Sequence, residues 1–148
     1  DGRIGDYETS MVMMNDYRHI EELAPLTKQQ RLELLHQLGD EAARHIGQGL
    51  RSGLQQYSEV YVVTHIPPVR GACWYEGQIA DDEWAPHFTC HAVGVAILEI
   101  AAEFPSGQVT VLCGHTHSPG ICQAADNVVI HTAAAEYERP QLSQILEF

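Results

Sequence analysis

Three histidines follow directly after two short apolar stretches, a placement that is typical of a metal site. The run EVYVVT at residues 59–64 ends at His65, and the run QVTVLC at residues 108–113 is followed by His115 and His117. Apolar, β-branched runs of this length predict buried strands. Ligands of an open α/β sheet bind outside the carboxyl ends of its strands, so histidines far apart in the sequence can converge there. Because neutral imidazole is the commonest metal ligand, we predict that these three side chains bind metal.

The spacing of His115 and His117 adds a geometric reason for this prediction. Residues two apart in an extended segment project to the same side. Gly114 permits the tight turn that would direct both rings into a cleft. An isolated pair with this spacing is more often two ordinary loop histidines, but the glycine, the preceding strand and His65 together favour the metal-binding interpretation.

Other families that contain a His-x-His pair fit the sequence less well. A metallo-β-lactamase needs Asp and His soon after the second histidine, where this chain has Ser118, Pro119 and Gly120. A cupin is rich in strands, whereas this chain has two predicted helices. An amidohydrolase carries the pair at the first strand of a barrel of about 250 residues, and this chain has 148.

The segments VVTHIPP and VLCGHTH, in this order and each at a predicted strand end, resemble the last two motifs of the calcineurin-like metallophosphoesterases. The resemblance extends over the whole chain. It implies a binuclear metal centre in which His65 and His115 share one divalent ion and His117 binds the other. It also implies hydrolysis of a small phosphomonoester or phosphodiester, with two ions of Mn, Fe, Zn, Ni or Mg as cofactors.

The earlier motifs of that family, DxH, GDxxD and GNH followed by an acid, do not occur in this sequence. In the family they supply a bridging Asp, an Asn ligand and the His that assists the leaving group. Gly39 and Asp40 are followed by Glu41 within a helical pattern, so the second Asp of GDxxD is missing. A two-metal site needs a bridging carboxylate, because neutral imidazoles do not offset the charge of two divalent ions. We therefore expect residues 1–148 to be the C-terminal part of a single metallophosphoesterase domain, whose other ligands lie in a missing N-terminal half or a second chain.

Two further hypotheses stay open. The chain could be a non-catalytic structural fragment that binds one metal weakly or none. It could also be a mononuclear hydrolase in which three histidines and a water molecule meet one zinc ion, as the ligand count of a catalytic zinc site allows. The sequence identifies no catalytic residue apart from the metal ligands and no substrate-binding residue.

Other polar and aromatic residues are weaker candidates. His87 and His91 are four positions apart without an HExxH motif, so capping or surface packing is their expected role. The acidic run at residues 81–83 is expected to be solvated. Three aromatic residues are expected either to line a substrate cleft or to pack in the core: Trp74, Tyr75 and Trp84. Four histidines without a motif are expected to be structural or exposed: His19, His36, His45 and His131.

The elements that must position the histidines follow from the hydrophobic pattern. Thr27 and Gln30 have capping-box spacing, and apolar residues then recur at three- and four-residue steps, which predicts an amphipathic helix over residues 28–56. A second, largely apolar helix is predicted from about Thr89 to Phe104. Residues 1–25 and the segment from His65 to about Pro86 are predicted as loops. The last part reads as a meander with strands near residues 121–124, 128–132 and 142–148. Together these elements predict an α/β fold with layered mixed β-sheets flanked by helices.

Composition limits the partners of the chain. It has 20 acidic and 8 basic residues, a formal net charge of −12 and no basic run, so binding to a nucleic-acid backbone or an anionic membrane is not expected. Bound cations would still permit a small phosphorylated substrate. No stretch approaches the roughly 18 apolar residues of a membrane span. The four cysteines form no CxxC pair and are predicted to be free thiols of a cytoplasmic protein. An exposed half-site would favour association into a homo-oligomer.

Overall fold

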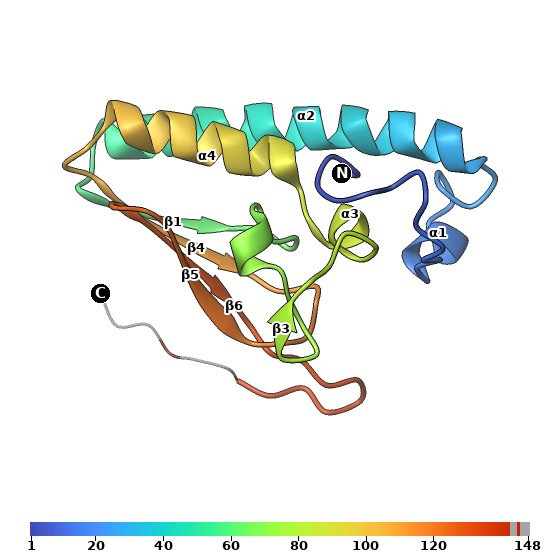
Figure 1. Cartoon of the computed structure of the whole chain (residues 1–148). Helices are drawn as coiled ribbons and strands as arrows, with labels where there is room; N and C mark the ends of the chain where they lie inside the picture. Colours follow the sequence, from blue (N-terminus) through green and yellow to red (C-terminus); the bar gives the residue numbers. More distant parts are fainter. Residues whose placement is uncertain (143–144, 146–148) are drawn as a thin grey trace.

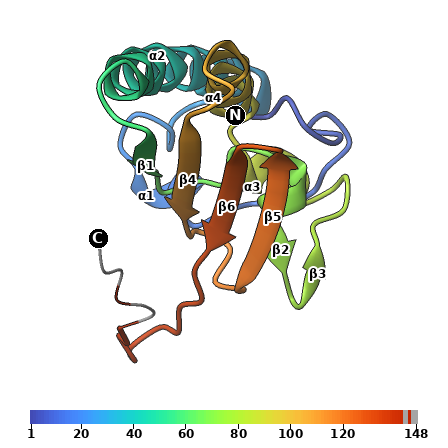
Figure 2. The ribbon, with the colours of Figure 1, turned by 90° about the vertical axis from the view of Figure 1, so that its left-hand side faces the viewer.

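A computed structural model describes residues 1–142 and residue 145, and it shows two long helices above one face of a four-stranded sheet (Figure 1). Helices α2 (Lys28–Leu54) and α4 (His91–Glu103) lie side by side on that face, as an end-on view shows (Figure 2). The sheet has the order β1-β4-β6-β5, formed by β1 (Glu59–Val63), β4 (Gln108–Cys113), β6 (Val128–Thr132) and β5 (Gly120–Ala125). Strands β1, β4 and β6 are parallel, and β5 is antiparallel to β6. The prediction of an α/β fold is confirmed at this level.

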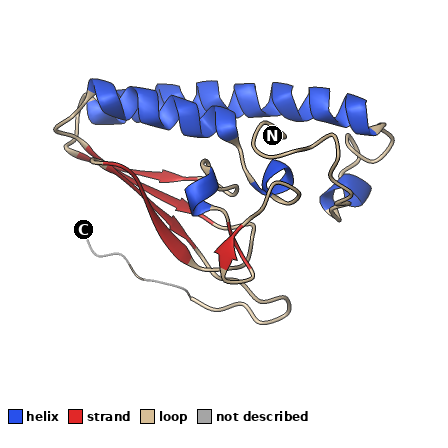
Figure 3. Ribbon diagram, viewed as in Figure 1, coloured by secondary structure: helices blue, strands red, loops and turns tan. Residues whose placement is uncertain are grey.

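Short elements occupy the connections between the main ones (Figure 3). They are α1 (Asp16–His19), the 3-10 helix η1 (Arg70–Ala72), β2 (Trp74–Tyr75), β3 (Gln78–Ile79) and α3 (Ala85–Phe88). Strands β2 and β3 form a hairpin whose turn residues, Glu76 and Gly77, have φ values of 50° and 80°. Positive φ at both positions is what a two-residue hairpin turn of this hand requires. The segment after His65, which is predicted as a loop, therefore contains a 3-10 helix, a short hairpin and the start of α3.

The first long helix begins where the sequence predicts. The hydroxyl oxygen of Thr27 accepts a hydrogen bond from the main-chain N–H of Gln30 at 3.3 Å, and the Gln30 side chain accepts one from the main-chain N–H of Thr27 at 3.0 Å. This reciprocal pair is the capping box that the spacing indicated. The second helix is also confirmed, with its first residue at His91 rather than Thr89.

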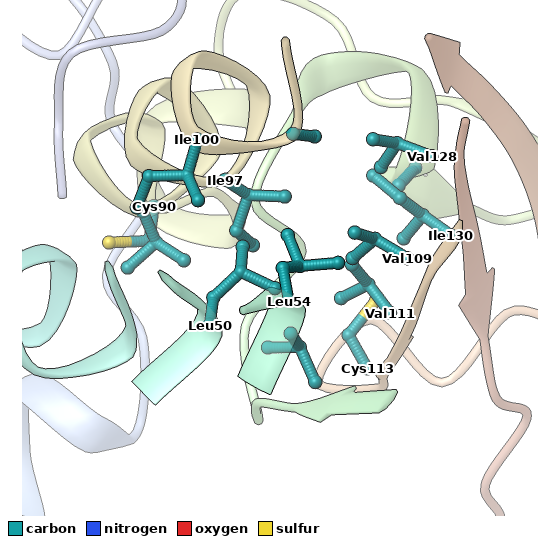
Figure 4. Packing of buried hydrophobic residues seen from close by; sticks show 14 residues of the cluster. Leu50, Leu54, Cys90, Ile97, Ile100, Val109, Val111, Cys113, Val128 and Ile130 are labelled. Carbon is teal, nitrogen blue, oxygen red and sulfur yellow. The ribbon is translucent and has the colours of Figure 1, made fainter. Parts of the chain in front are cut away.

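The core lies between the helix pair and the sheet (Figure 4). Burial alternates along β4, where Val109, Val111 and Cys113 are buried, because successive side chains of a strand point to opposite faces. On the helix side, Leu50 of α2 and Ile97 of α4 belong to the same core. Among the described residues, no helix has both the length and the apolar character needed to cross a bilayer.

The strands after β4 do not join the sheet in chain order. Strand β6 lies between β4 and β5, so the connection at residues 114–119, which carries two of the histidines, passes the carboxyl end of β6. The turn before β6 is anchored by Asn127, whose side-chain amide donates to the carbonyls of Ala101, Phe104 and Gly107 at 2.9 to 3.2 Å. The strand predicted at residues 142–148 falls mostly outside the described residues. Leu142 and Ile145, which are described, are exposed and lie in no strand.

Helix α4 packs directly on the loop that follows His65. The main-chain N–H of Cys90 donates to the carbonyl of Pro67 at 2.9 Å. Gly94 lies so close to Pro68 that a Cβ atom at this position would stand 2.0 Å from the Pro68 carbonyl oxygen. A glycine is therefore required if the helix is to hold this loop in place.

We expect Gly94→Ala to lower the free energy of unfolding by at least about 2 kcal/mol, because the added methyl group forces α4 away from Pro68. Gly49→Ala is the matched control, since a Cβ atom there meets nothing within 4 Å on an exposed part of α2. The control should raise the free energy of unfolding by about 0.5 to 1 kcal/mol. Urea unfolding followed by circular dichroism measures both variants. Equal effects of the two substitutions would contradict the close contact between α4 and Pro68.

Candidate metal centre

His65 and His115 lie next to each other because β1 and β4 are neighbouring parallel strands. The two strands pair in register from Glu59 with Gln108 to Val63 with Leu112. Beyond the last paired residues, the main-chain N–H of Gly114 donates to the carbonyl of His65 at 3.0 Å. This bond ties the two loops together at the carboxyl edge of the sheet, where ligands of α/β proteins collect.

The side chains of these two histidines also meet. Nδ1 of His115 lies 3.1 Å from Nε2 of His65, and the ring centroids are 4.9 Å apart in an edge-on arrangement. Metal–imidazole bonds of about 2.0 to 2.1 Å place two nitrogens on one ion about 2.8 to 3.4 Å apart, for coordination angles between 90° and tetrahedral. The observed separation fits two ligands of a single ion. It equally suits a direct hydrogen bond between the rings.

His117 has different surroundings. Its ring packs edge-on against Tyr137, with centroids 4.7 Å apart. The backbone from Gly114 onward bends, with positive φ at His115 (69°) and His117 (60°), so the expectation of an extended segment here is wrong. Within residues 1–142 and residue 145, no group of three or more His, Cys, Asp or Glu side chains is placed to hold a metal.

The backbone at His115 is strained. The main-chain N–H of Thr116 donates to the carbonyl of Gly114 at 2.8 Å, and His115, between them, has φ of 69°. A three-residue turn with positive φ at its centre is rare outside glycine. Such strain costs on the order of 1 to 3 kcal/mol and is found mainly at functional sites, where the surrounding structure enforces it.

The His115 side chain is also held in an unusual environment. Its Nε2 atom is buried and has no hydrogen-bond partner among the described residues, and Phe88 packs edge-on against the ring with centroids 5.4 Å apart. Burial lowers the pKa of His115, and the nearby His65 lowers it further, while the Asp16 carboxylate and the main chain of His87 act in the opposite direction. The imidazole is therefore kept in the neutral form that binds metal ions.

Aromatic residues support His115 from the side of Phe88. Trp84 stacks on Phe88 with centroids 5.2 Å apart, and Tyr75 contacts both rings at 4.8 and 5.1 Å. Of the two roles expected for the aromatic group, these contacts show packing for Tyr75 and Trp84. Trp74 lies elsewhere, against Gly120, and its buried indole nitrogen has no partner in the described part of the chain.

The acidic run near the site is solvated, as expected. Asp81, Asp82 and Glu83 are exposed. Asp82 pairs with Arg70, and Asp81 accepts hydrogen bonds from the main-chain N–H groups of Glu83 and Trp84 at 3.0 Å. The histidines without a motif are dispersed over three elements: His19 ends α1, His36 and His45 lie on α2, and His131 lies on β6.

His87 is a buried structural residue, contrary to the expected surface or capping role, whereas His91 is exposed at the start of α4. The Ser10 hydroxyl lies 2.9 Å from its Nε2, and the Tyr17 hydroxyl lies 2.7 Å from its Nδ1. Burial, followed by the positive charge of Lys28, lowers the pKa of His87 to about 4. The network joins α3 to the N-terminal segment.

The N-terminal segment contributes residues that sequence reasoning missed. Ser10 and Tyr17 hold His87, and the Asp16 carboxylate is close enough to His115 to affect its pKa. These residues lie in the stretch predicted as irregular, and their local sequence shows neither a motif nor a periodic pattern. Only the packing of this segment against α3 and α2 reveals them.

A cavity of about 310 Å³ opens beside His115. It lies beneath the first half of α2, which contributes Leu35, Leu38 and Ala42, and it is also lined by Asp16 of α1. The sequence predicted no substrate-binding residue, and this cavity is visible only in the folded chain.

Searches against protein-family models, curated proteins and solved structures find no match to this chain. The site is therefore interpreted from its own geometry.

The buried His87 predicts a specific pH dependence of stability. The folded state keeps His87 neutral down to a pKa of about 4, whereas an unfolded histidine takes up a proton near its ordinary pKa of 6.5. The unfolded state therefore binds more protons between these values. This contribution to stability is complete above pH 6.5 and is lost as the pH falls toward 4.

We expect the wild-type chain to lose about 2 kcal/mol more stability than His87→Gln between pH 7 and pH 4.5, because the variant lacks this titration. Urea denaturation at each pH measures the difference. His45→Gln, on an exposed turn of α2, is the control and should follow the wild type. Parallel pH profiles for wild type and His87→Gln would contradict a neutral, buried His87.

Proposed function

We propose that this chain supplies part of the metal site of a phosphoesterase that hydrolyses small phosphomonoesters or phosphodiesters. The observation that carries the proposal is the His65–His115 pair, whose facing nitrogens are 3.1 Å apart at the carboxyl edge of a parallel strand pair. The strained turn at His115 and its buried, unpartnered Nε2 support a functional rather than a structural role for this pair.

The division of ligands follows the resemblance to calcineurin-like phosphoesterases. In this proposal His65 and His115 bind one divalent ion and His117 binds a second, the ions being Mn, Fe, Zn, Ni or Mg. Bound divalent ions would supply Lewis-acid stabilisation of the charge that develops on the phosphoryl oxygens. His65 and His115 would direct ring nitrogens toward the ion position, and Phe88 packs edge-on against the His115 ring.

The remaining ligands have to come from elsewhere. A two-metal site needs a bridging carboxylate, and no described carboxylate is grouped with the histidines. Strand β1, which carries His65 at its carboxyl end, is an edge strand of the sheet. A further parallel strand from a missing N-terminal half or a second chain would bring its own carboxyl end beside His65. The chain would then be the C-terminal part of a larger layered α/β sandwich.

The four cysteines support a reducing compartment for the complete protein. All four are free, and three of them, Cys73, Cys90 and Cys113, are buried. The proposed location is therefore the cytoplasm.

A structural role with weak or single metal binding is the second candidate function. The observation that favours it is that only two of the three histidines face each other, while His117 packs against Tyr137. The same observation weighs against a mononuclear site built from all three histidines.

The first test is metal binding by this chain. We expect His65→Ala and His115→Ala each to weaken zinc binding at least about tenfold, because each removes a direct ligand. Isothermal titration calorimetry measures the affinity, and His45→Ala provides an exposed histidine control on α2. Zinc affinities that are the same in wild type and both variants would refute the assignment of these two ligands.

The second test is catalysis. For the chain alone we expect at most one weakly held ion and no turnover of an aryl phosphodiester, because the carboxylate ligands are missing. For the protein made from the full reading frame that contains this chain, we expect two ions by elemental analysis and hydrolysis that falls at least about 100-fold in His115→Ala. Two tightly held ions and turnover by the chain alone would show that its ligand set is complete. Zinc bound by a full-length protein that hydrolyses no phosphoester would support the structural role instead.

A further inference from the structure

The cavity beside His115 has the position of a substrate pocket. Its about 310 Å³ lies at the lower end of the usual range for small-molecule sites. It opens at the carboxyl ends of the parallel strands, because Ile66, after β1, and His115, after β4, both line it. It is therefore continuous with the proposed metal centre.

The wall of the cavity is largely apolar. Leu35, Leu38 and Ala42 of α2 line one side, and the described lining residues include no lysine or arginine. The charged side chains at the wall are the carboxylates of Asp1 and Asp16. The Asp1 carboxylate is paired with Arg3. With no lysine or arginine in the described wall, a phosphoryl group finds no cationic side chain here, whereas an uncharged apolar group would be favoured by burial.

One polar atom of a lining residue, Nε2 of His115, is suited to orient a ligand. With Nδ1 of His115 as the proposed metal ligand, the neutral ring would carry its proton on Nε2, which is buried and has no partner among the described residues. An unmade hydrogen bond from a buried donor is costly, so an oxygen acceptor on a ligand would be bound there. The other imidazole at the wall, His87, already has both nitrogens engaged by Ser10 and Tyr17.

We propose that this cavity binds the organic group of the phosphoester, an uncharged, ring-sized group whose linking oxygen accepts a hydrogen bond from His115 Nε2. The phosphoryl group stays at the His65–His115 pair. This inference rests on the proposed phosphoesterase function for the identity of the ligand, and on the cavity alone for its shape and polarity. Binding of the organic group in this cavity would make the chain selective for aryl or similarly bulky esters over small alkyl esters.

The first arm of the test needs no metal. Benzyl alcohol is titrated into the ¹⁵N-labelled chain, and we expect saturable shifts of the amide signals of Gly39 and Ala42, which line the cavity. Ala42→Phe fills the space and should abolish the shifts. Leu38→Phe, at a more exposed position of the same wall, repeats the test if the first variant does not fold. Ala102→Phe places the same ring on an exposed part of α4 and should leave the shifts unchanged.

The second arm uses the zinc-loaded protein from the full reading frame and two non-hydrolysable probes, phenylphosphonate and methylphosphonate. We expect phenylphosphonate to bind at least about tenfold more tightly, because its ring is buried. Filling the cavity should remove this preference and leave methylphosphonate binding unchanged.

The outcomes separate the two proposals. Equal binding of both phosphonates, or no benzyl alcohol shifts, would overturn the cavity assignment and leave the phosphoesterase proposal standing. Benzyl alcohol binding without binding of either phosphonate would overturn the phosphoester assignment together with the proposed function. Shifts and ring preference that both disappear in the filled variants would support the pocket.

Discussion

The parallel pairing of β1 with β4 is the constraint on which the rest of the site depends. It aligns Val63 with Leu112 and continues into the bond from Gly114 to the His65 carbonyl. A parallel pair places both carboxyl ends at one edge, so two histidines separated by the whole of α4 become neighbours. Helix α4 bridges the two strands and holds the loop after His65 through Gly94 and Pro68.

The energetically unfavourable features of this arrangement are found at His115. Its backbone has positive φ, its ring is held in a largely apolar environment, and its Nε2 has no partner in the described chain. The contacts that hold it are His65 and Phe88, the latter with its stacked aromatic neighbours. A strained residue maintained by rigid surroundings on two sides is what preorganisation of a ligand-binding side chain requires.

The charge of the chain is consistent with separate proposed sites for the phosphoryl group and for the organic group of a ligand. With a net charge of −12 and no lysine or arginine at the described cavity wall, the chain would bind a phosphorylated molecule, as proposed, only where bound cations reverse the local field. The anionic part of such a molecule would then bind at the proposed metal centre and its apolar part in the cavity. His115 borders both sites. The N-terminal segment forms part of this boundary through Asp16, and the buried bonds of Tyr17 and Ser10 to His87 hold the segment against α3.

The sequence by itself determined both long helices, the strands β1, β4, β5 and β6 and the two strand-end motifs, because local periodicity and capping chemistry are sufficient to define such elements. Tertiary structure decided the order β1-β4-β6-β5, which the sequence left open, since strand pairing depends on contacts between distant residues. The expected antiparallel neighbours β5 and β6 do pair with each other. Tertiary structure also decided that His65 and His115 meet while His117 packs on Tyr137, and that the backbone at both loop histidines is left-handed rather than extended. The roles of Asp16, Tyr17 and His87 and the cavity itself exist only after α1, α2 and α3 pack together, and no local pattern encodes a space that several distant segments enclose.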